Sequence, residues 1–353
     1  MTFYVKIICE MEKLVLVGKS LEELEKFMID NNQSKFRAKQ VYNWLYLKSV
    51  DSFDKMTDLP LTARELLKEK CEIASISLKD KQVSKDGTMK FLFEHSDGTF
   101  AEAVLMRFDN RANLTACIST QVGCPMGCSF CATAKLGFVR NLDCSEIIQQ
   151  IFLIQADTGL KVTNIVYMGQ GEPLLNFDNL ISSIKMFREY FQIGARRITV
   201  STCGLIPQIN KLAELDFQST LAISLHAPNQ QVREEIMPVA KKYKYDELIT
   251  TLKKYTEKTG RRVTVEYVLM KDVNDSVEDA KQLSLAIAKL KSNVNLIVYN
   301  QNEKSPYKRP LKENILKFKY ILEASGKKVT TRLERGGDID AACGQLSAKM
   351  QKK

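Results

Sequence analysis

The sequence predicts an α/β protein built around a parallel sheet, and two observations support this prediction. Short apolar segments recur along the second two-thirds of the chain, at residues 115–120, 164–168, 197–201, 220–225, 263–269 and 294–299. Helical patterns separate most of these segments, and apolar strands that alternate with helices form parallel sheets covered by helices. Six such strands are too few to close the usual parallel barrel, so we expect a partial (βα)6 barrel, with its functional groups at the carboxyl ends of the strands.

The helical segments of this region carry apolar periodicity and start signals. The segment 248–255 repeats Leu and Tyr at helical spacing. The segment 277–290 repeats apolar residues in the same way, behind a start signal at Ser276. A last strand, 328–333, leads into a glycine-rich tail.

The first part of the chain is expected to be helical and then to form hairpins. A capping box of Ser20 and Glu23 begins the helical region 20–72, in which a second helix is expected over 36–48. Alternating segments follow, interrupted by two sequences typical of hairpin turns, Lys85-Asp86-Gly87 and Ser96-Asp97-Gly98. We therefore expect an N-terminal helical domain over residues 1–73, a β-hairpin linker region over 74–110 and the barrel over 111–353.

Composition narrows the possible classes of function. The 44% of hydrophobic and 27% of charged residues are typical of globular proteins, and no run approaches the roughly 18 apolar residues of a membrane helix, so no membrane partner is expected. A net charge of +10 is compatible with a polyanionic partner such as nucleic acid. Nine cysteines, an odd number without an export signal, fit a reducing, cytoplasmic compartment.

Three cysteines lie close together, in the segment GCPMGCSFC: Cys124, Cys128 and Cys131. Their spacing could place them on one face of a helix, but the glycines and proline among them favour a loop. A structural zinc site needs a fourth ligand, and no further Cys or His lies nearby. Three thiolates suit an iron–sulfur cluster that keeps one iron open for an outside ligand. A buried helical stripe and a zinc site are the alternatives.

The spacing CxxxCxxC after the first strand of a six-unit partial barrel resembles the radical SAM superfamily. There the open iron binds the amino and carboxylate groups of S-adenosylmethionine (SAM), and reduction yields a 5′-deoxyadenosyl radical. Segments 117–124 and 132–142 are more specific, and they resemble the RlmN/Cfr family of RNA adenine methyltransferases. The resemblance implies a radical SAM partial barrel, a 4Fe-4S cluster on Cys124, Cys128 and Cys131, and two SAM molecules per turnover.

Further motifs at the strand ends match SAM-binding segments of this family. The sequence GQGEP after the second strand resembles the family's GxGEP, which binds the SAM ammonium group. Gln170 stands where the family usually has Met, and Cys203 places an additional thiol near the site. The residues that the resemblance assigns to SAM binding are Gly171, Glu172, Ser201, Ser224, Leu225, His226 and Asn300.

The tail segment DIDAACGQ, residues 338–345, is the most specific motif of the chain, and in the family its cysteine carries the methyl group. An electron-poor adenine carbon cannot attack the SAM methyl group, whereas a thiolate can. The resemblance implies that Cys343 takes a methyl group from one SAM and that a second SAM yields the radical that removes a hydrogen from it. The carbon radical then adds to adenine, and Cys117 releases the product by forming a disulfide with Cys343. Glu102 matches the family's proton acceptor, although a solvated strand carboxylate is a competing interpretation.

The family includes enzymes that methylate carbon 2 of adenine, the RlmN type, and enzymes that methylate carbon 8, the Cfr type. Segments 137–141 and 172–176 look like the RlmN type, which acts on 23S rRNA and, in some members, on tRNA beside the anticodon. Lys35, Arg37 and Lys39 would suit an RNA-facing N-terminal domain, although a basic helix face is usually just solvated.

The resemblance also implies two redox partners. These are an electron donor such as flavodoxin or ferredoxin, and a thiol reductant for the Cys117–Cys343 disulfide. Two other classes of protein remain open at this point: a non-catalytic RNA-binding protein with a structural metal, and a radical SAM enzyme that acts on protein. In neither class would Cys117 and Cys343 be needed.

Overall fold

The computed structural model describes residues 13–107, 113–301, 305–332 and 334–348. The chain divides into two compact units, Met1–Ser75 and Ile76–Lys353. No helix in these described ranges is long and apolar enough to span a membrane.

The smaller unit is helical, as the sequence predicts. It contains α1 (Leu21–Asp30), α2 (Lys35–Tyr42) and α3 (Leu61–Lys70), and a short parallel bridge joins β1 (Leu14–Val15) to β2 (Cys71–Glu72). The capping box is confirmed, because the Ser20 hydroxyl accepts from the Glu23 amide and the Glu23 carboxylate accepts from the Ser20 amide. The second expected helix is confirmed as α2, which widens over Asn43–Leu47 into a π-helical turn.

The larger unit is built on one ten-stranded sheet with the order β14-β13-β12-β11-β10-β9-β6-β5-β4-β3. All neighbours from β14 to β6 are parallel. The parallel strands are β6 (Leu114–Cys117), β9 (Asn164–Tyr167), β10 (Ile198–Thr202), β11 (Thr220–Ser224), β12 (Val263–Leu269), β13 (Ser292–Val298) and β14 (Lys328–Arg332). The six apolar segments and the last strand are thus confirmed, and the linear order makes the sheet an open, partial barrel.

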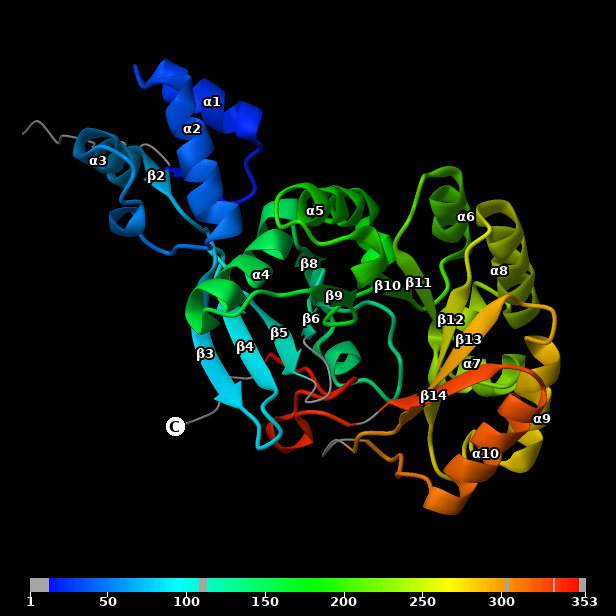
Figure 1. The fold of residues 1–353 in the computed structure, drawn as a ribbon. Helices are drawn as coiled ribbons and strands as arrows, with labels where there is room; N and C mark the ends of the chain where they lie inside the picture. The colour runs from blue at the N-terminus through cyan, green and yellow to red at the C-terminus, as the bar shows by residue number, and fades with distance from the viewer. Residues whose placement is uncertain (1–12, 108–112, 302–304, 333, 349–353) are drawn as a thin grey trace, which may run out of the picture. The chain divides into compact units, whose positions relative to one another are not determined.

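Helices follow the parallel strands and cover one face of the sheet (Figure 1). They are α4 (Cys144–Thr158), α5 (Phe177–Glu189), α6 (Ile206–Glu214), α7 (Gln230–Ile236), α8 (Tyr245–Thr259), α9 (Val277–Ala286) and α10 (Lys312–Ala324). The apolar repeat over 248–255 is buried in α8, as predicted. The predicted helix over 277–290 begins at its Ser276 cap but ends at Ala286, so the last apolar residues of that pattern pack beyond the helix.

The hairpin region extends the barrel sheet. Strands β3 (Ser77–Val83), β4 (Met89–Glu94) and β5 (Phe100–Arg107) are antiparallel, and β5 pairs antiparallel with β6. Both predicted hairpin turns lie between these strands. The expected linker region is therefore part of the larger unit's sheet rather than a connection between two domains.

A separate two-stranded ribbon stands between β6 and α4. Strand β6 ends at Cys117, earlier than the 115–120 expected, and β7 (Gln121–Gly123) then pairs antiparallel with β8 (Phe138–Asn141). The three clustered cysteines lie in the connection between β7 and β8. This ribbon holds them just past the carboxyl end of the first parallel strand.

Candidate active site

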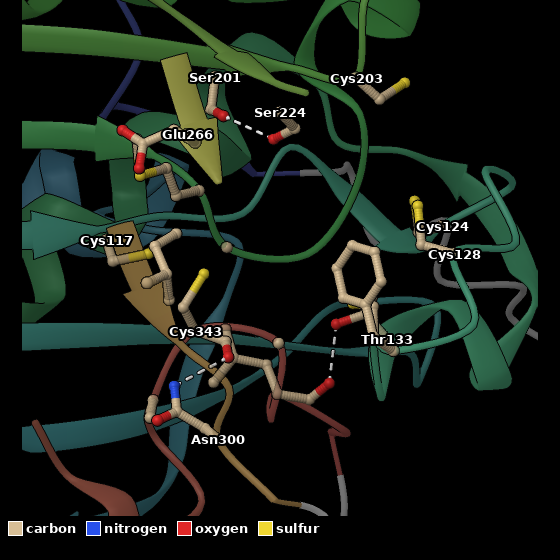
Figure 2. Close-up of a pocket in the computed structure, with 18 of the residues that line it drawn as sticks. Cys117, Cys124, Cys128, Thr133, Ser201, Cys203, Ser224, Glu266, Asn300 and Cys343 are labelled. Carbon is tan, nitrogen blue, oxygen red and sulfur yellow. Dashed lines mark hydrogen bonds between the residues drawn. The ribbon is translucent and has the colours of Figure 1, made fainter. Parts of the chain in front are cut away.

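A cavity lies at the carboxyl ends of the parallel strands, and Figure 2 shows residues from several of them turned toward it. Its empty space is about 1360 Å³, part of it open to solvent. The residues of the larger unit that are discussed in the following paragraphs line this cavity or support its wall.

The three clustered cysteines line one side of the cavity. Their loop is fixed at its start, where the Cys124 amide donates to the Gly137 carbonyl at 2.7 Å, and in its middle, where the Ser129 amide donates to the Ile236 carbonyl at 3.0 Å. Burial raises the pKa of the Cys124 thiol to about 12, and burial likewise raises the pKa of Cys128. Without a bound cation these thiols stay protonated at neutral pH.

The residues present fit an iron–sulfur cluster better than a single metal ion. Among the described residues no three Cys, His, Asp or Glu side chains converge so that they could hold one ion. In a cluster each thiolate binds its own iron, so the ligands need not meet at one point. Three thiols on one loop at the edge of a large cavity satisfy that requirement and leave space on the cavity side for a further ligand.

The turn after β9 forms the floor of the cavity. Gly171 has a φ of +101°, and a Cβ there would lie 2.6 Å from the Gln121 side chain, so only glycine fits. The Glu172 carboxylate is buried and accepts from the amides of Leu174 at 3.0 Å and Cys203 at 2.7 Å. Burial raises the pKa of Glu172, while these amides oppose the change. A carboxylate held this way is suited to accept from a ligand ammonium group.

The two departures from the family pattern are both buried, Cys203 at the cavity wall and Gln170 behind it. The Cys203 thiol is buried with its sulfur 3.2 Å from the Met126 sulfur, and burial raises its pKa well above the usual value. The Gln170 side chain is buried, and its carbonyl oxygen accepts from the Glu102 amide at 3.2 Å. Gln170 thereby links the turn after β9 to β5.

His226 is neutral and points its ring at the cavity. Burial lowers its pKa to about 3, and the buried Arg233 guanidinium adds to the shift. The His226 Nδ1 accepts from the Val268 amide at 3.1 Å, so the ring proton is on Nε2. The neighbouring Leu225 does not line the cavity; its side chain is fully buried, and only its backbone lies near the site.

Arg233 joins the carboxyl ends of β10 and β11 by hydrogen bonds. It is fully buried, and its guanidinium donates to the carbonyls of Cys203 at 2.6 Å and Leu225 at 3.2 Å. These contacts hold the two strand ends that carry Ser201 and Ser224, whose hydroxyl oxygens are 3.4 Å apart at the cavity wall (Figure 2).

The side-chain amide of Asn300, after β13, uses its nitrogen in a hydrogen bond, whereas its oxygen has no hydrogen-bond partner. Its Nδ2 donates to the Cys343 carbonyl at 3.3 Å, whereas its Oδ1 is buried and has no partner. An acceptor buried at a cavity without a partner is costly unless a ligand supplies a donor. Of the seven residues expected to bind SAM, the structure brings all except Leu225 to the cavity wall.

Cys117 and Cys343 are far apart in the sequence but line the same cavity (Figure 2). Both are free thiols, as are the other cysteines of the described ranges. Burial raises the pKa of Cys117 to about 12 and also raises that of Cys343, whereas the Arg332 guanidinium lowers both. Cys343 as a whole residue is exposed, whereas Cys117 is half-buried; the thiol of Cys343 and its immediate surroundings are nevertheless shielded from solvent.

Glu102 is not at the cavity wall. It is buried on β5, where one carboxylate oxygen accepts from the amides of Ser347 and Ala348, each at 2.8 Å. The other oxygen lies 3.4 Å from the Lys90 ammonium group. The competing interpretation of a solvated strand carboxylate is therefore wrong, and the structure places Glu102 against the tail that follows Cys343.

Glu266 and Arg332 are among the cavity residues that sequence reasoning missed. The Glu266 carboxylate is buried, with one oxygen accepting from Asn295 at 2.9 Å and the other 4.0 Å from the Arg332 guanidinium. Burial raises the pKa of Glu266, and Arg332 lowers it in part. A charged residue inside the apolar segment VTVEYVL was the signal that could have identified Glu266, because such positions seldom hold a charge without a role.

In the smaller unit, the basic residues expected to face RNA are partly engaged. Lys35 forms an ion pair with Glu25 at 3.0 Å, and Arg37 donates to Gln40 at 2.7 Å. The Lys35 side chain remains largely exposed. No contact here tests an interaction with RNA.

Comparison with known proteins agrees with this geometry. The model of the radical SAM superfamily matches residues 118–283, and that of the ribosomal RNA large subunit methyltransferase N-terminal domain matches residues 14–73. A probable dual-specificity RNA methyltransferase RlmN of Alkaliphilus oremlandii is 47% identical over 96% of this chain and 99% of its own length. The corresponding protein of Thermotoga petrophila is 46% identical over 95% and 97%. The crystal structure of a radical SAM methyltransferase from Sphaerobacter thermophilus superposes with a TM-score of 0.90, at 41% identity, over 95% of this chain and 100% of that chain.

An open parallel barrel with three loop cysteines at its carboxyl end defines a radical SAM enzyme, and this class implies SAM and an iron–sulfur cluster. The matches extend over both units of the chain. The chain belongs to the RlmN family.

Proposed function

We propose that this protein methylates carbon 2 of a specific adenine in 23S rRNA, and also of an adenine beside the tRNA anticodon, through a methylated Cys343. The observation that supports this proposal most strongly is the position of Cys117 and Cys343. Two thiols far apart in the sequence line the same cavity as the three clustered cysteines. A radical SAM enzyme that does not use a cysteine as a carrier has no need for this pair.

The cofactor roles follow from the cavity wall. Cys124, Cys128 and Cys131 would hold a 4Fe-4S cluster, which when reduced supplies the electron that cleaves SAM. Glu172 would accept from the SAM ammonium group, and the unpartnered Asn300 Oδ1 would accept from a further donor. Ser201, Ser224, Gly171, His226 and the backbone of Leu225 would complete the contacts to SAM, of which each turnover uses two molecules.

The two thiols would act in sequence. The Cys343 sulfur, after losing its proton, forms a bond to the SAM methyl carbon while the carbon–sulfonium bond breaks and its electron pair stays on the SAM sulfur. After the methyl carbon has become attached to adenine, the Cys117 thiolate forms a bond to the Cys343 sulfur, and the electron pair of the broken sulfur–carbon bond goes to the product. The Arg332 guanidinium favours the thiolate form of both cysteines. The resulting disulfide is reduced by an external thiol.

Glu102 would accept the proton that the adenine carbon loses. In the present conformation one of its oxygens is occupied by the amides of Ser347 and Ala348. Because Glu102 is also buried and does not line the cavity, acting as the proton acceptor would require the tail that contacts it to move.

The substrate and partners follow from the family and from charge. Relatives at 44–47% identity are named dual-specificity RNA methyltransferases, and the net charge of +10 suits an RNA partner. The electron would come from a flavodoxin or a ferredoxin. The reaction would take place in the cytoplasm, where a reducing thiol pool and the proposed RNA substrates would both be present.

The test is methylation of 23S rRNA fragments and of tRNA by the chain purified without oxygen, with SAM and a reductant. Mass spectrometry of the digested RNA locates the methyl group. We expect 2-methyladenine with the wild type, none with Cys343→Ala, and an RNA-crosslinked chain with Cys117→Ala. Cys144→Ala is the matched control, because this thiol lies outside the cavity beside Met186 and should leave methylation unchanged.

Two outcomes would contradict the proposal. Methylation at carbon 8 would make the enzyme Cfr-like. Methylation that persists in Cys343→Ala would show that Cys343 is not the methyl carrier.

A further inference from the structure

The loop that carries Cys343 lies beside the antiparallel strands β3–β5, which are no part of the parallel barrel (Figure 1). Its apolar side chains Ala341 and Leu346 pack with Val104 of β5. Its polar groups contact the same three strands at several points, on both sides of Cys343 in the sequence.

The turn between β3 and β4 binds the loop on the N-terminal side of Cys343. The Ser84 hydroxyl donates to one Asp338 carboxylate oxygen at 2.6 Å, and the Lys85 amide donates to the other at 3.2 Å. In the opposite direction, the Gly336 amide donates to the Asp86 carboxylate at 3.0 Å. A carboxylate of the loop thus accepts from the turn, and a carboxylate of the turn accepts from the loop. These reciprocal contacts fix the register of the loop on the turn.

The backbone of the loop approaches the hairpin too closely for a side chain at Gly336. This residue has a φ of +64°, and a Cβ there would lie 2.7 Å from the Ala341 Cβ and 3.0 Å from the Thr88 side chain. The Ala341 amide closes the turn by donating to the Gly336 carbonyl at 2.9 Å. The turn before Cys343 is therefore fitted to the surface of the hairpin.

A second anchor contacts the loop on both sides of Cys343. Lys90 of β4 lies 3.5 Å from the Asp340 carbonyl and 3.4 Å from the Glu102 carboxylate. Glu102 in turn accepts from the amides of Ser347 and Ala348. Lys90 and Glu102 are both buried, so these contacts are shielded from water.

We propose that strands β3–β5 form a cradle for the Cys343 loop and that Asp338 is a positioning residue, which fixes Cys343 opposite Cys117. The inference rests on the proposed function, because positioning Cys343 opposite Cys117 matters for the methyl transfer to adenine and for the release of the product by Cys117. It assigns a positioning role to the hairpin region, none of whose residues is among those expected to bind SAM or the cluster. Asp338 acts through the backbone, five residues before Cys343, and does not touch the reacting atoms.

The test measures how well the two thiols are positioned, independently of methylation. The cluster-loaded chain is equilibrated without oxygen in glutathione buffers of graded redox potential and is then quenched with acid and alkylated. Mass spectrometry quantifies the peptide disulfide between Cys117 and Cys343, and the midpoint gives their effective concentration relative to glutathione. Asp338→Ala should lower this effective concentration about tenfold, since two hydrogen bonds to a charged group are lost.

Three further variants keep the inference falsifiable. Ser84→Ala removes one hydroxyl and should lower the effective concentration two- to threefold, and Asp338→Asn should restore part of the loss because it keeps an acceptor for Ser84. Asp80→Asn is the matched control on β3, whose carboxylate contacts Gln82 rather than the loop, and it should behave as the wild type. A wild-type effective concentration in both Asp338→Ala and Ser84→Ala would overturn the cradle.

The outcomes separate the cradle from the proposed function. A loss of effective concentration together with an unchanged urea midpoint of unfolding supports positioning, whether or not the chain methylates RNA. If RNA methylation fails while the disulfide equilibrium responds to Asp338, the proposed function is wrong and the cradle stands. If the Asp338→Ala variant does not fold, the effective concentration measured in Ser84→Ala alone decides whether the cradle positions Cys343.

Discussion

Gly123, directly before the first cluster cysteine, is the position where one added methyl group should do most damage. Its φ is +74°, and a Cβ there would lie 2.0 Å from the Gly137 carbonyl oxygen. Ordinary contacts begin at 3.4 Å, so β8 would have to move by more than 1 Å. The same carbonyl accepts the Cys124 amide at 2.7 Å, and this hydrogen bond would be lost.

The cost of Gly123→Ala has two parts. Placing alanine at a left-handed φ costs about 1–2 kcal/mol at any site. The collision and the lost hydrogen bond add about 2 kcal/mol more, as overpacking and a broken backbone bond usually do. Gly159, at the end of α4, isolates the first part, because its φ is +67° and an added Cβ would meet nothing within 4 Å.

The assay compares Gly123→Ala with Gly159→Ala in two measurements. Urea unfolding of the larger unit should show Gly123→Ala to be about 2 kcal/mol less stable than Gly159→Ala. Iron and acid-labile sulfide per chain, after anaerobic reconstitution, should fall in Gly123→Ala and stay at the wild-type level in Gly159→Ala. Equal stability and equal iron in the two variants would refute the reasoning that the β7–β8 ribbon sets the cluster loop.

Three other substitutions give separate tests. Burial raises the pKa of Glu146, but hydrogen bonds from His95 and Arg140 outweigh it and bring the pKa down to about 2. The lowered pKa stabilises the fold above about pH 4.5, and this contribution is lost as the pH falls toward 2. At pH 7 the free energy of unfolding of Glu146→Gln should be about 1–2 kcal/mol lower than that of the wild type, after solvent screening. Urea titrations at decreasing pH should show this difference becoming smaller. Arg332→Met should slow alkylation of Cys343 by iodoacetamide at pH 8 several-fold, because loss of the guanidinium raises the thiol pKa. Peptide mass spectrometry measures the alkylation rate. An unchanged rate would count against this electrostatic role of Arg332. Cys203→Ala should keep full iron content, since the backbone amide that holds Glu172 is retained; a loss of iron would mean that this thiol is a ligand.

The parts of the fold that the sequence predicted well are those specified by neighbouring residues. The strand 263–269 is rich in β-branched and apolar residues apart from Glu266, and it is found as β12. The capping box at Ser20 depends on two residues three positions apart, and both of its hydrogen bonds form. The turns at Asp86 and Asp97 follow from Asp-Gly sequences, whose glycines have φ near +78°.

The parts that could not be predicted depend on contacts between distant residues or on very short elements. Strand β7 has three residues, too few for any periodicity to be recognised, and it forms only because β8 pairs with it. The contact between Ser84 and Asp338 joins residues 254 positions apart, and nothing in either local sequence specifies it. Glu266 also went unassigned, because its neighbours on β13 and β14 are far along the chain.

Glu102 shows why a motif match alone could not assign a mechanism to that carboxylate. The residue type and its strand were correctly identified from the sequence, but its surroundings come from Lys90 and from the tail after Cys343. A proton acceptor must have a lone pair directed at the proton donor, and here one oxygen already accepts from two amides. If Glu102 serves in the reaction, its release and the displacement of the tail are one event, since the same contacts hold both. The segment that carries Cys343 would then have to move before the last proton transfer, which couples the position of the methyl carrier to the order of the chemical steps.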